Sequence, residues 1–108
     1  MADYPSARIQ PYSVAKIAIQ EFTKLWAYEL GSKGIRVNAI APGPIASAQI
    51  DKVIASNPAR SLETMVAEVP LGRIGQPTDV GAAAVFLASD AAEWISGATI
   101  LISGGKRW

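Results

Sequence analysis

GIRVNAIAPG, residues 34–43, is the stretch of sequence that indicates the fold most clearly. Its centre, residues 35–41, is short, rich in β-forming residues and mostly apolar, and Pro42 and Gly43 end it sharply. A run of this kind between turn residues is typical of a parallel strand that is buried on both faces. We therefore predict a strand over residues 35–41, followed by a loop.

A long amphipathic segment precedes this strand. Residues 11–33 are expected to form a helix, because Pro11 suits a first turn and Gly31 and Gly34 are stop signals. One broad sector of this helix is apolar, and it holds Val14, Ala15, Ala18, Ile19, Phe22, Leu25, Trp26 and Leu30, widened by Ile17 and Tyr28. We expect one side of the sector to pack on a sheet and the other side to pack on another helix or subunit.

The rest of the chain alternates helical patterns with one more strand. Short helical patterns cover residues 48–56 and 61–69, and Asn57-Pro58 interrupts them. Pro77 opens a stronger helix, and residues 98–103 have the pattern of a second buried strand. The order of long helix, strand, short helices, helix and strand predicts an α/β fold, namely half of a doubly wound parallel sheet.

Composition narrows the possible functions. With 108 residues, the chain is long enough for one domain, which we expect over residues 1–108. Charged side chains make up 18% of the residues and the net charge is +1, so we expect no nucleic-acid partner. No apolar run approaches the roughly 18 residues that span a bilayer, so we expect no membrane partner and a cytoplasmic location. Cysteine and histidine are both absent, which excludes a Ser-His-Asp triad and a cysteine nucleophile and argues against a metal site.

The candidate catalytic pair lies near the start of the long helix. Tyr12 and Lys16 occupy positions i and i+4, which are neighbours on one helical face. A unit charge about 4 Å away contributes roughly 4 kcal/mol at an effective dielectric of 20. A nearby ammonium would therefore lower the pKa of the phenol toward neutrality and suit it to exchange a proton with an alcohol or carbonyl oxygen. Most isolated Tyr-x-x-x-Lys pairs are surface pairs without a catalytic role. The neighbouring motifs therefore have to show whether this pair is catalytic.

Those neighbouring motifs follow in a fixed order. They are residues 34–43, PIAS at 44–47, PLGRIGQPTDV at 70–80, FLASD at 86–90, and Ser96-Gly97. Together with the Tyr12 to Lys16 block, they resemble the C-terminal portion of the classical short-chain dehydrogenase/reductase family. The subgroup most similar to them contains 3-oxoacyl-(acyl carrier protein) reductases and gluconate 5-dehydrogenases. This resemblance implies a Rossmann-like fold.

The resemblance also implies an activity. The family transfers a hydride between an alcohol and a carbonyl compound with NAD(P) as the cofactor. Tyr12 would then be the general acid and base at the substrate oxygen. Lys16 would lower the pKa of that tyrosine and bind the ribose hydroxyls of the nicotinamide half.

A second set of implied site residues follows the first strand. Pro42 and Gly43 would shape the wall beside the nicotinamide, and the Ile45 backbone would meet its carboxamide. The Ser47 hydroxyl would stand where the family usually has threonine. The alternative is that the two prolines and the glycine of residues 42–44 only end a strand.

Three further residues and one segment have expected roles. Asn38 and Arg73 are expected to have structural roles, the first within a strand and the second as a loop anchor. Residues 44–70 correspond to the segment with which the family covers its substrate, and sugar or polyol, 3-oxoacyl thioester and steroid-like substrates all stay open. Ser103 stands where the family usually has aspartate before two glycines.

Several family features have no counterpart in the sequence. None of the nine glycines forms the Gly-x-x-x-Gly-x-Gly turn that binds a pyrophosphate. The family's catalytic serine would fall before Met1. Two parallel strands alone would also leave sheet edges and helix faces exposed. We therefore expect a homo-oligomer, or assembly with a complementary N-terminal half, as the route to activity.

Two other functions compete with the oxidoreductase. The first is a noncatalytic fragment whose function is to oligomerise through the helix over residues 11–33. The second is a hydrolase or lyase that uses Tyr12 and Lys16 without a nucleotide.

Overall fold

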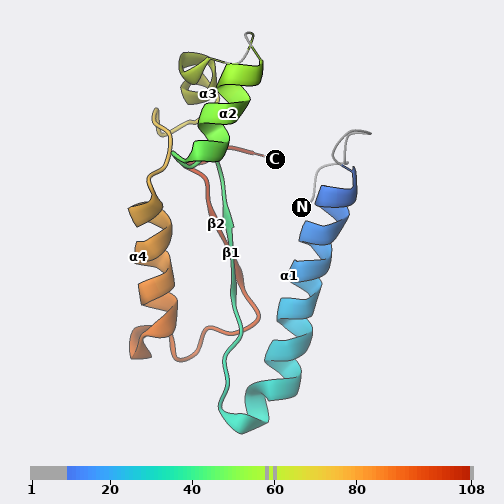
Figure 1. Ribbon diagram of the computed structural model, residues 1–108. Helices are drawn as coiled ribbons and strands as arrows, with labels where there is room; N and C mark the ends of the chain where they lie inside the picture. Colours follow the sequence, from blue (N-terminus) through green and yellow to red (C-terminus); the bar gives the residue numbers. More distant parts are fainter. Residues whose placement is uncertain (1–9, 58, 60, 108) are drawn as a thin grey trace. The chain divides into compact units, whose positions relative to one another are not determined.

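The computed structural model describes residues 10–57, 59 and 61–107. Its helices are α1 (Gln10–Leu30), α2 (Ala48–Ser56), α3 (Leu62–Ala67) and α4 (Pro77–Ala88), with 3₁₀ turns at Gly31–Lys33 and Asp90–Ala92. Its strands are β1 (Ala39–Pro42) and β2 (Thr99–Ile102) (Figure 1). The predicted order of long helix, strand, short helices, helix and strand is confirmed, and so is the α/β fold class.

The two strands pair in parallel. Within the described residues they form a two-stranded sheet, and Figure 1 draws them side by side. The Ala39 amide donates to the Ala98 carbonyl at 2.9 Å, and the Gly43 amide donates to the Ile102 carbonyl at 2.7 Å. Because both bonds advance toward higher residue numbers on both strands, the pair is parallel, and the connection between them holds three helices.

Strand β1 begins at Ala39 rather than at residue 35 as predicted. In the preceding segment, side-chain bonds stand beside a single backbone bond. The Gly97 amide donates to the Val37 carbonyl at 2.7 Å, whereas the Val37 amide donates to Ser96 Oγ at 3.2 Å and Asn38 Nδ2 donates to the Ile95 carbonyl at 2.9 Å. Asn38 Oδ1 also accepts from the Ala98 amide at 3.1 Å. The apolar pattern therefore extended the predicted strand too far. Asn38 makes structural hydrogen bonds as predicted, but it lies just before β1 rather than within a strand.

The helix ends follow recognisable capping residues. Helix α1 gives way to the 3₁₀ turn and then to Gly34, which has φ +74°, a conformation that glycine adopts easily after a helix. Helix α3 is shorter than predicted at both ends. It begins at Leu62, because Ser61 Oγ caps it by accepting from the Thr64 amide at 3.2 Å, and it ends at Ala67, after which the Val69 amide donates to the Val66 carbonyl in a tighter turn. Helices α2 and α4 begin at the predicted residues.

The chain divides into two compact units. The first holds α1, residues 31–39 and residues 87–100, and the second holds residues 40–86 and 101–107. In the first unit, the buried side chains include Thr23, Leu87 and Ala92. In the second unit, they include Met65, Val69, Ile74 and Ser103. Each core is small, and the single domain expected over residues 1–108 stays a prediction.

Arg36 organises the first unit around the end of α4. Its guanidinium donates to the Leu87 carbonyl at 2.7 Å and to the Ser89 and Ile95 carbonyls at 3.5 and 3.4 Å. The last carbonyls of a helix lack partners within the helix, and a basic side chain near them is favourable. Arg36 therefore closes the C-terminal end of α4.

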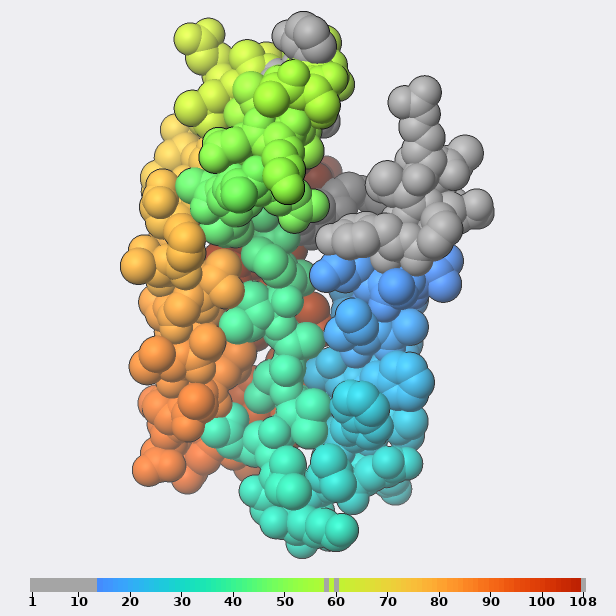
Figure 2. Space-filling view, viewed as in Figure 1, coloured from blue at the N-terminus to red at the C-terminus, as the bar shows by residue number. Residues whose placement is uncertain are grey.

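The apolar sector of α1 remains accessible. Phe22 and Trp26 are each 49% exposed, and their rings stack with centroids 5.3 Å apart. Thr23 is buried instead, and its hydroxyl donates to the Ile19 carbonyl at 2.8 Å. Helix α1 is the blue-to-cyan part of Figure 2, and its exposed large apolar side chains include Val14, Ile17, Ile19, Leu25 and Tyr28.

Candidate functional site

The predicted proton-transfer pair belongs to α1. The helix is unbroken from Gln10 to Leu30, so residues 12 and 16 lie about one turn apart on the same face. The Lys16 side chain is exposed, whereas the Tyr12 side chain lies outside the described part of the structure. The helical spacing on which the pair depends is present, and the roles of the two residues stay predictions.

The second predicted set of site residues belongs to the second unit, where β1 ends. Pro42 is the last residue of β1, and the Gly43 amide donates to the Ile102 carbonyl at the end of β2. A Cβ on Gly43 would lie 2.8 Å from Ser103 Cα, which is closer than such atoms approach. Gly43 is therefore required where the two strands end, whatever its role toward a cofactor.

Ile45 is held by a bridge to Gly75. The Ala46 amide donates to the Gly75 carbonyl at 2.8 Å, and the Gly75 amide donates to the Pro44 carbonyl at 2.9 Å, which makes Ile45 and Gly75 a parallel bridge. In such a bridge the residues on either side carry the hydrogen bonds. The amide and the carbonyl of Ile45 itself therefore point away from Gly75, together on the opposite side.

Ser47 caps the helix that follows this loop. It is the N-cap residue of α2, and its Oγ accepts from the Ile50 amide at 3.4 Å. Sequence reasoning missed this role, although a serine immediately before a helical pattern is a standard sign of an N-cap. The cap uses an acceptor lone pair, so the hydroxyl proton can still be donated to another group.

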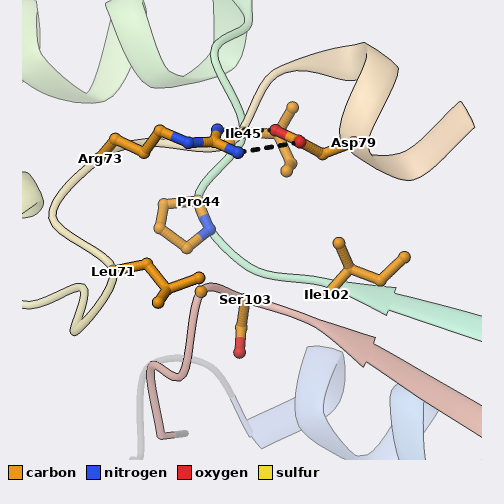
Figure 3. Close-up of a pocket in the computed structure, with 9 residues that line it drawn as sticks. Pro44, Ile45, Leu71, Arg73, Asp79, Ile102 and Ser103 are labelled. Carbon is orange, nitrogen blue, oxygen red and sulfur yellow. Dashed lines mark hydrogen bonds and ion pairs between the residues drawn. The ribbon is translucent and has the colours of Figure 1, made fainter. Parts of the chain in front are cut away.

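A small cavity of about 150 Å³ adjoins the loop. Figure 3 shows Pro44 between the Arg73 and Asp79 side chains on one side and the Leu71 and Ser103 side chains on the other. Its lining comprises Pro44, Ile45, Leu71, Arg73, Gly75, Asp79, Ile102, Ser103 and Gly104. Ligand pockets commonly have volumes of about 300 to 1,000 Å³, so this cavity alone is too small for a dinucleotide.

Arg73 and Asp79 form a two-point ion pair beside the cavity. Arg73 Nη1 donates to Asp79 Oδ2 at 2.8 Å and Arg73 Nη2 donates to Asp79 Oδ1 at 3.0 Å (Figure 3). Asp79 Oδ2 also accepts from the Gln76 amide at 2.7 Å, at the start of α4. The Arg73 hydrogen bond, aided by that of Gln76, lowers the pKa of Asp79 to about 2.

This ion pair serves the fold rather than proton transfer. Asp79 in turn raises the pKa of Arg73, and Arg73 Nη1 also donates to the Ile74 carbonyl at 3.2 Å. A carboxylate whose pKa lies this low stays charged near neutral pH and is a poor proton donor there. The predicted role of Arg73 as a loop anchor is confirmed, and its partner Asp79 was not predicted.

Two features are absent from the described residues. No helix there is long and apolar enough to cross a membrane. No group of three or more acidic, histidine or cysteine side chains there could hold a metal ion.

Comparison with known proteins places the chain among relatives of greater length. The family described as enoyl-(acyl carrier protein) reductase matches residues 2–107. The 3-oxoacyl-(acyl-carrier-protein) reductase of Thermotoga maritima is 40% identical over 94 residues, which cover 87% of this chain and 37% of that protein. The 7alpha-hydroxysteroid dehydrogenase of Escherichia coli is 38% identical over 104 residues, which cover 96% of this chain and 40% of that protein.

A solved structure agrees with these sequence relatives. It is a 7alpha-hydroxysteroid dehydrogenase complexed with NADH and 7-oxo glycochenodeoxycholic acid, with a TM-score of 0.85 and 38% identity over 97% of this chain and 40% of that chain. The chain thus spans 37 to 40% of the length of these relatives. Because the family match covers nearly all of the sequence and the folds agree, the chain belongs to the classical short-chain dehydrogenase/reductase family and carries its C-terminal portion.

Proposed function

We propose that the chain carries the proton-transfer pair and the nicotinamide-side loop of an oxidoreductase that interconverts an alcohol and a carbonyl compound. The relatives named above are oxidoreductases, and one of them is described as bound to NADH. The observation that carries the proposal is the unbroken helix α1 through residues 12 and 16. It gives the two positions the spacing at which an amine can tune a phenol.

Proton transfer is the task we assign to this pair. In the direction of reduction, the Tyr12 phenol donates its proton to the carbonyl oxygen, and in the direction of oxidation the phenolate takes a proton from the hydroxyl. The Lys16 ammonium favours the phenolate and therefore lowers the pKa of Tyr12. Lys16 also binds the ribose hydroxyls of the nicotinamide half. When bound, NAD(P) supplies or accepts the hydride at the carbonyl carbon.

The loop after β1 has groups that suit a carboxamide. A carboxamide carries both donors and an acceptor, and Ile45 offers one amide and one carbonyl on the side away from Gly75. Ser47 adds a hydroxyl that can donate while it caps α2. Pro42 and Gly43 form the adjoining wall. The residues present therefore fit the nicotinamide half of a dinucleotide.

Substrate and partners follow from the same assignment. Residues 44–70, which include α2 and α3, cover a small-molecule alcohol or carbonyl substrate. Neither the 3-oxoacyl nor the hydroxysteroid class named for the relatives is favoured by a residue of this chain. The adenine and pyrophosphate half of the cofactor requires groups from a second copy or from a complementary N-terminal half. The preference between NAD and NADP stays open, and the cytoplasmic location stays a prediction.

A second candidate function rests on the surface of α1. Phe22 and Trp26 are half-exposed, and Ile19 beside them is exposed as well. Contiguous apolar surface of this kind usually marks an interaction site. A module that only oligomerises through α1 would use this surface without any nucleotide.

Calorimetric titration with NADH and with NADPH, of the chain assembled with the nucleotide-binding half of a relative, separates the two functions. The oxidoreductase predicts saturable binding that is weakened at least about tenfold in Lys16→Met, since each 1.4 kcal/mol lost is a factor of ten. Lys33→Met, in the 3₁₀ turn after the same helix, is the matched control and should bind as the wild type does. No saturable binding in a sample that self-associates would favour the oligomerising module instead.

A further inference from the structure

The end of β2 turns back sharply. Gly104 and Gly105 have φ of +63° and +88°, and the Lys106 amide donates to the Ser103 carbonyl at 3.2 Å. Positive φ at both central residues defines a type I′ turn, which glycine permits. Ser103 is only 8% exposed, and its hydroxyl donates to the Lys106 carbonyl at 3.1 Å. The turn from Ser103 to Lys106 is therefore closed by two hydrogen bonds.

This turn packs directly on the chain that leaves α3. The Leu71 amide donates to the Gly104 carbonyl at 3.0 Å. A Cβ on Gly104 would lie 2.7 Å from Val69 Cγ1, and a Cβ on Gly105 would lie 3.3 Å from two carbons of the Pro70 ring. Val69 itself is only 4% exposed. The two glycines thus allow an approach that a larger residue would obstruct.

An ion pair extends the contact to the last turn of α3. Lys106 Nζ lies 2.8 Å from Glu68 Oε2, and the two side chains are 22% and 41% exposed. Glu68 is the C-cap residue of α3. A cation beside the C-terminal end of a helix is also favoured by the helix dipole. Lys106 therefore holds the end of α3 from the turn after β2.

The other helix of residues 44–70 is held less firmly. Helix α2 has no buried residue, whereas α3 buries Met65 and leads into the buried Val69. Segments with few buried apolar contacts open at lower free energy than packed ones. Among the described residues of 44–70, the buried side chains therefore lie in α3 and directly after it.

We propose that the turn from Ser103 to Lys106 anchors the α3 end of residues 44–70, with Lys106 as a positioning residue that acts through Glu68. The segment then opens by movement of α2, while α3 keeps its place on the turn. The inference depends on the proposed function only in treating residues 44–70 as the cover of the substrate. The anchor itself is a property of the second unit.

Hydrogen–deuterium exchange of the whole chain tests the anchor. Lys106→Met should speed amide exchange over residues 62–71 by about two- to fivefold, the range that a partly exposed ion pair supports. Lys106→Arg, which keeps the charge, should restore the wild-type rates. Lys52→Met, on α2, is the matched control and should leave residues 62–71 unchanged. The double charge exchange Glu68→Lys with Lys106→Glu should recover most of the protection.

Three results would overturn the proposal. The first is unchanged exchange over residues 62–71 in Lys106→Met, and the second is an equal effect of Lys52→Met. The third is faster exchange across α1 as well, because Lys106 would then support the whole fold rather than α3. The measurement needs neither nucleotide nor substrate. Its failure would therefore leave the hydride-transfer proposal intact, and failure of nucleotide binding would leave the anchor intact.

Discussion

Asp79 combines three structural tasks in one residue: it pairs with Arg73, accepts from the Gln76 amide and lies in the first turn of α4. Its pKa falls from 3.8 to about 2 because the Arg73 hydrogen bond favours the carboxylate. A folded-state pKa below the ordinary value adds stability that is complete above about pH 4 and is lost as the pH falls toward 2. The contribution is therefore present at neutral pH.

Asp79→Asn should lower the thermal unfolding midpoint at pH 7. The difference from the wild type should shrink between about pH 4 and pH 2, where the native carboxylate also becomes protonated. Circular dichroism melts across this range measure it, with Glu93→Gln in the first unit as a control of equal charge change. A deficit that is the same at pH 7 and pH 2 would show that the charge of Asp79 has no such role.

Gly43 offers a steric test at the same scale. Gly43→Ala places a Cβ 2.8 Å from the backbone of Ser103, so one of the strand ends must shift. Overpacking of this kind costs about 1 to 3 kcal/mol. Gly81→Ala, within α4, is the matched control because nothing lies within 4 Å of the new Cβ. That variant should gain about 0.8 to 1.0 kcal/mol from helix propensity.

Urea denaturation of the two alanine variants measures both changes in the free energy of unfolding. A Gly43→Ala chain as stable as the wild type would mean that the ends of β1 and β2 separate easily. The glycine would then be explained by a cofactor wall rather than by strand packing.

The roles of some single residues could be predicted from the sequence, whereas the roles of others could not. The structural roles of Asn38 and Arg73 were predictable because their polar groups occur beside a strand and in a loop, where partners are needed. The partner of Arg73 could not be predicted, because Asp79 in the first turn of a helix could equally have interacted only with the helix N-terminus. Ser47 matched a family position, but its capping of α2 was not predicted.

At the scale of elements, helices were predicted better than strands. Helix α2 begins where the helical pattern places its start, and α4 begins at Pro77 as predicted. Strand β1 is shorter than its apolar run, because Ser96 and Asn38 side chains take over hydrogen bonds that the ladder would make. Long-range side-chain bonds of this kind leave no local signal in a sequence.

Helix α1 predicts self-association through its apolar sector. Trp26→Glu puts a charge beside Phe22, where a partner surface would bury it at a high cost. We expect the molar mass by light scattering to fall toward that of one chain, 11.4 kDa. Lys24→Gln, on the same helix outside the sector, makes the same change in net charge at an exposed side chain and should keep the wild-type mass. A wild type that is already a single monomeric species would refute the expected oligomer.

At the scale of the whole molecule, the family could be predicted and the complete site could not. The ordered motifs from Tyr12 to Gly105 identified the family, and the match over residues 2–107 confirms it. The chain spans only 37 to 40% of the length of its relatives, so the groups for the adenine half and the family's serine have no counterpart in it. If residues 44–70 cover the substrate as proposed, their apolar and mixed polar side chains select no single substrate class.

Hydride transfer in a reconstituted site tests the central claim most directly. The chain would be mixed with the nucleotide-binding half of a relative, which alone should be inactive, and nicotinamide absorbance would be followed with 3-oxoacyl thioester and hydroxysteroid substrates. The account predicts activity that Tyr12→Phe reduces by about 100-fold or more and that Tyr28→Phe, on the same helix, leaves unchanged. Assembled halves that transfer no hydride, or a Tyr12→Phe variant as active as the wild type, would contradict it.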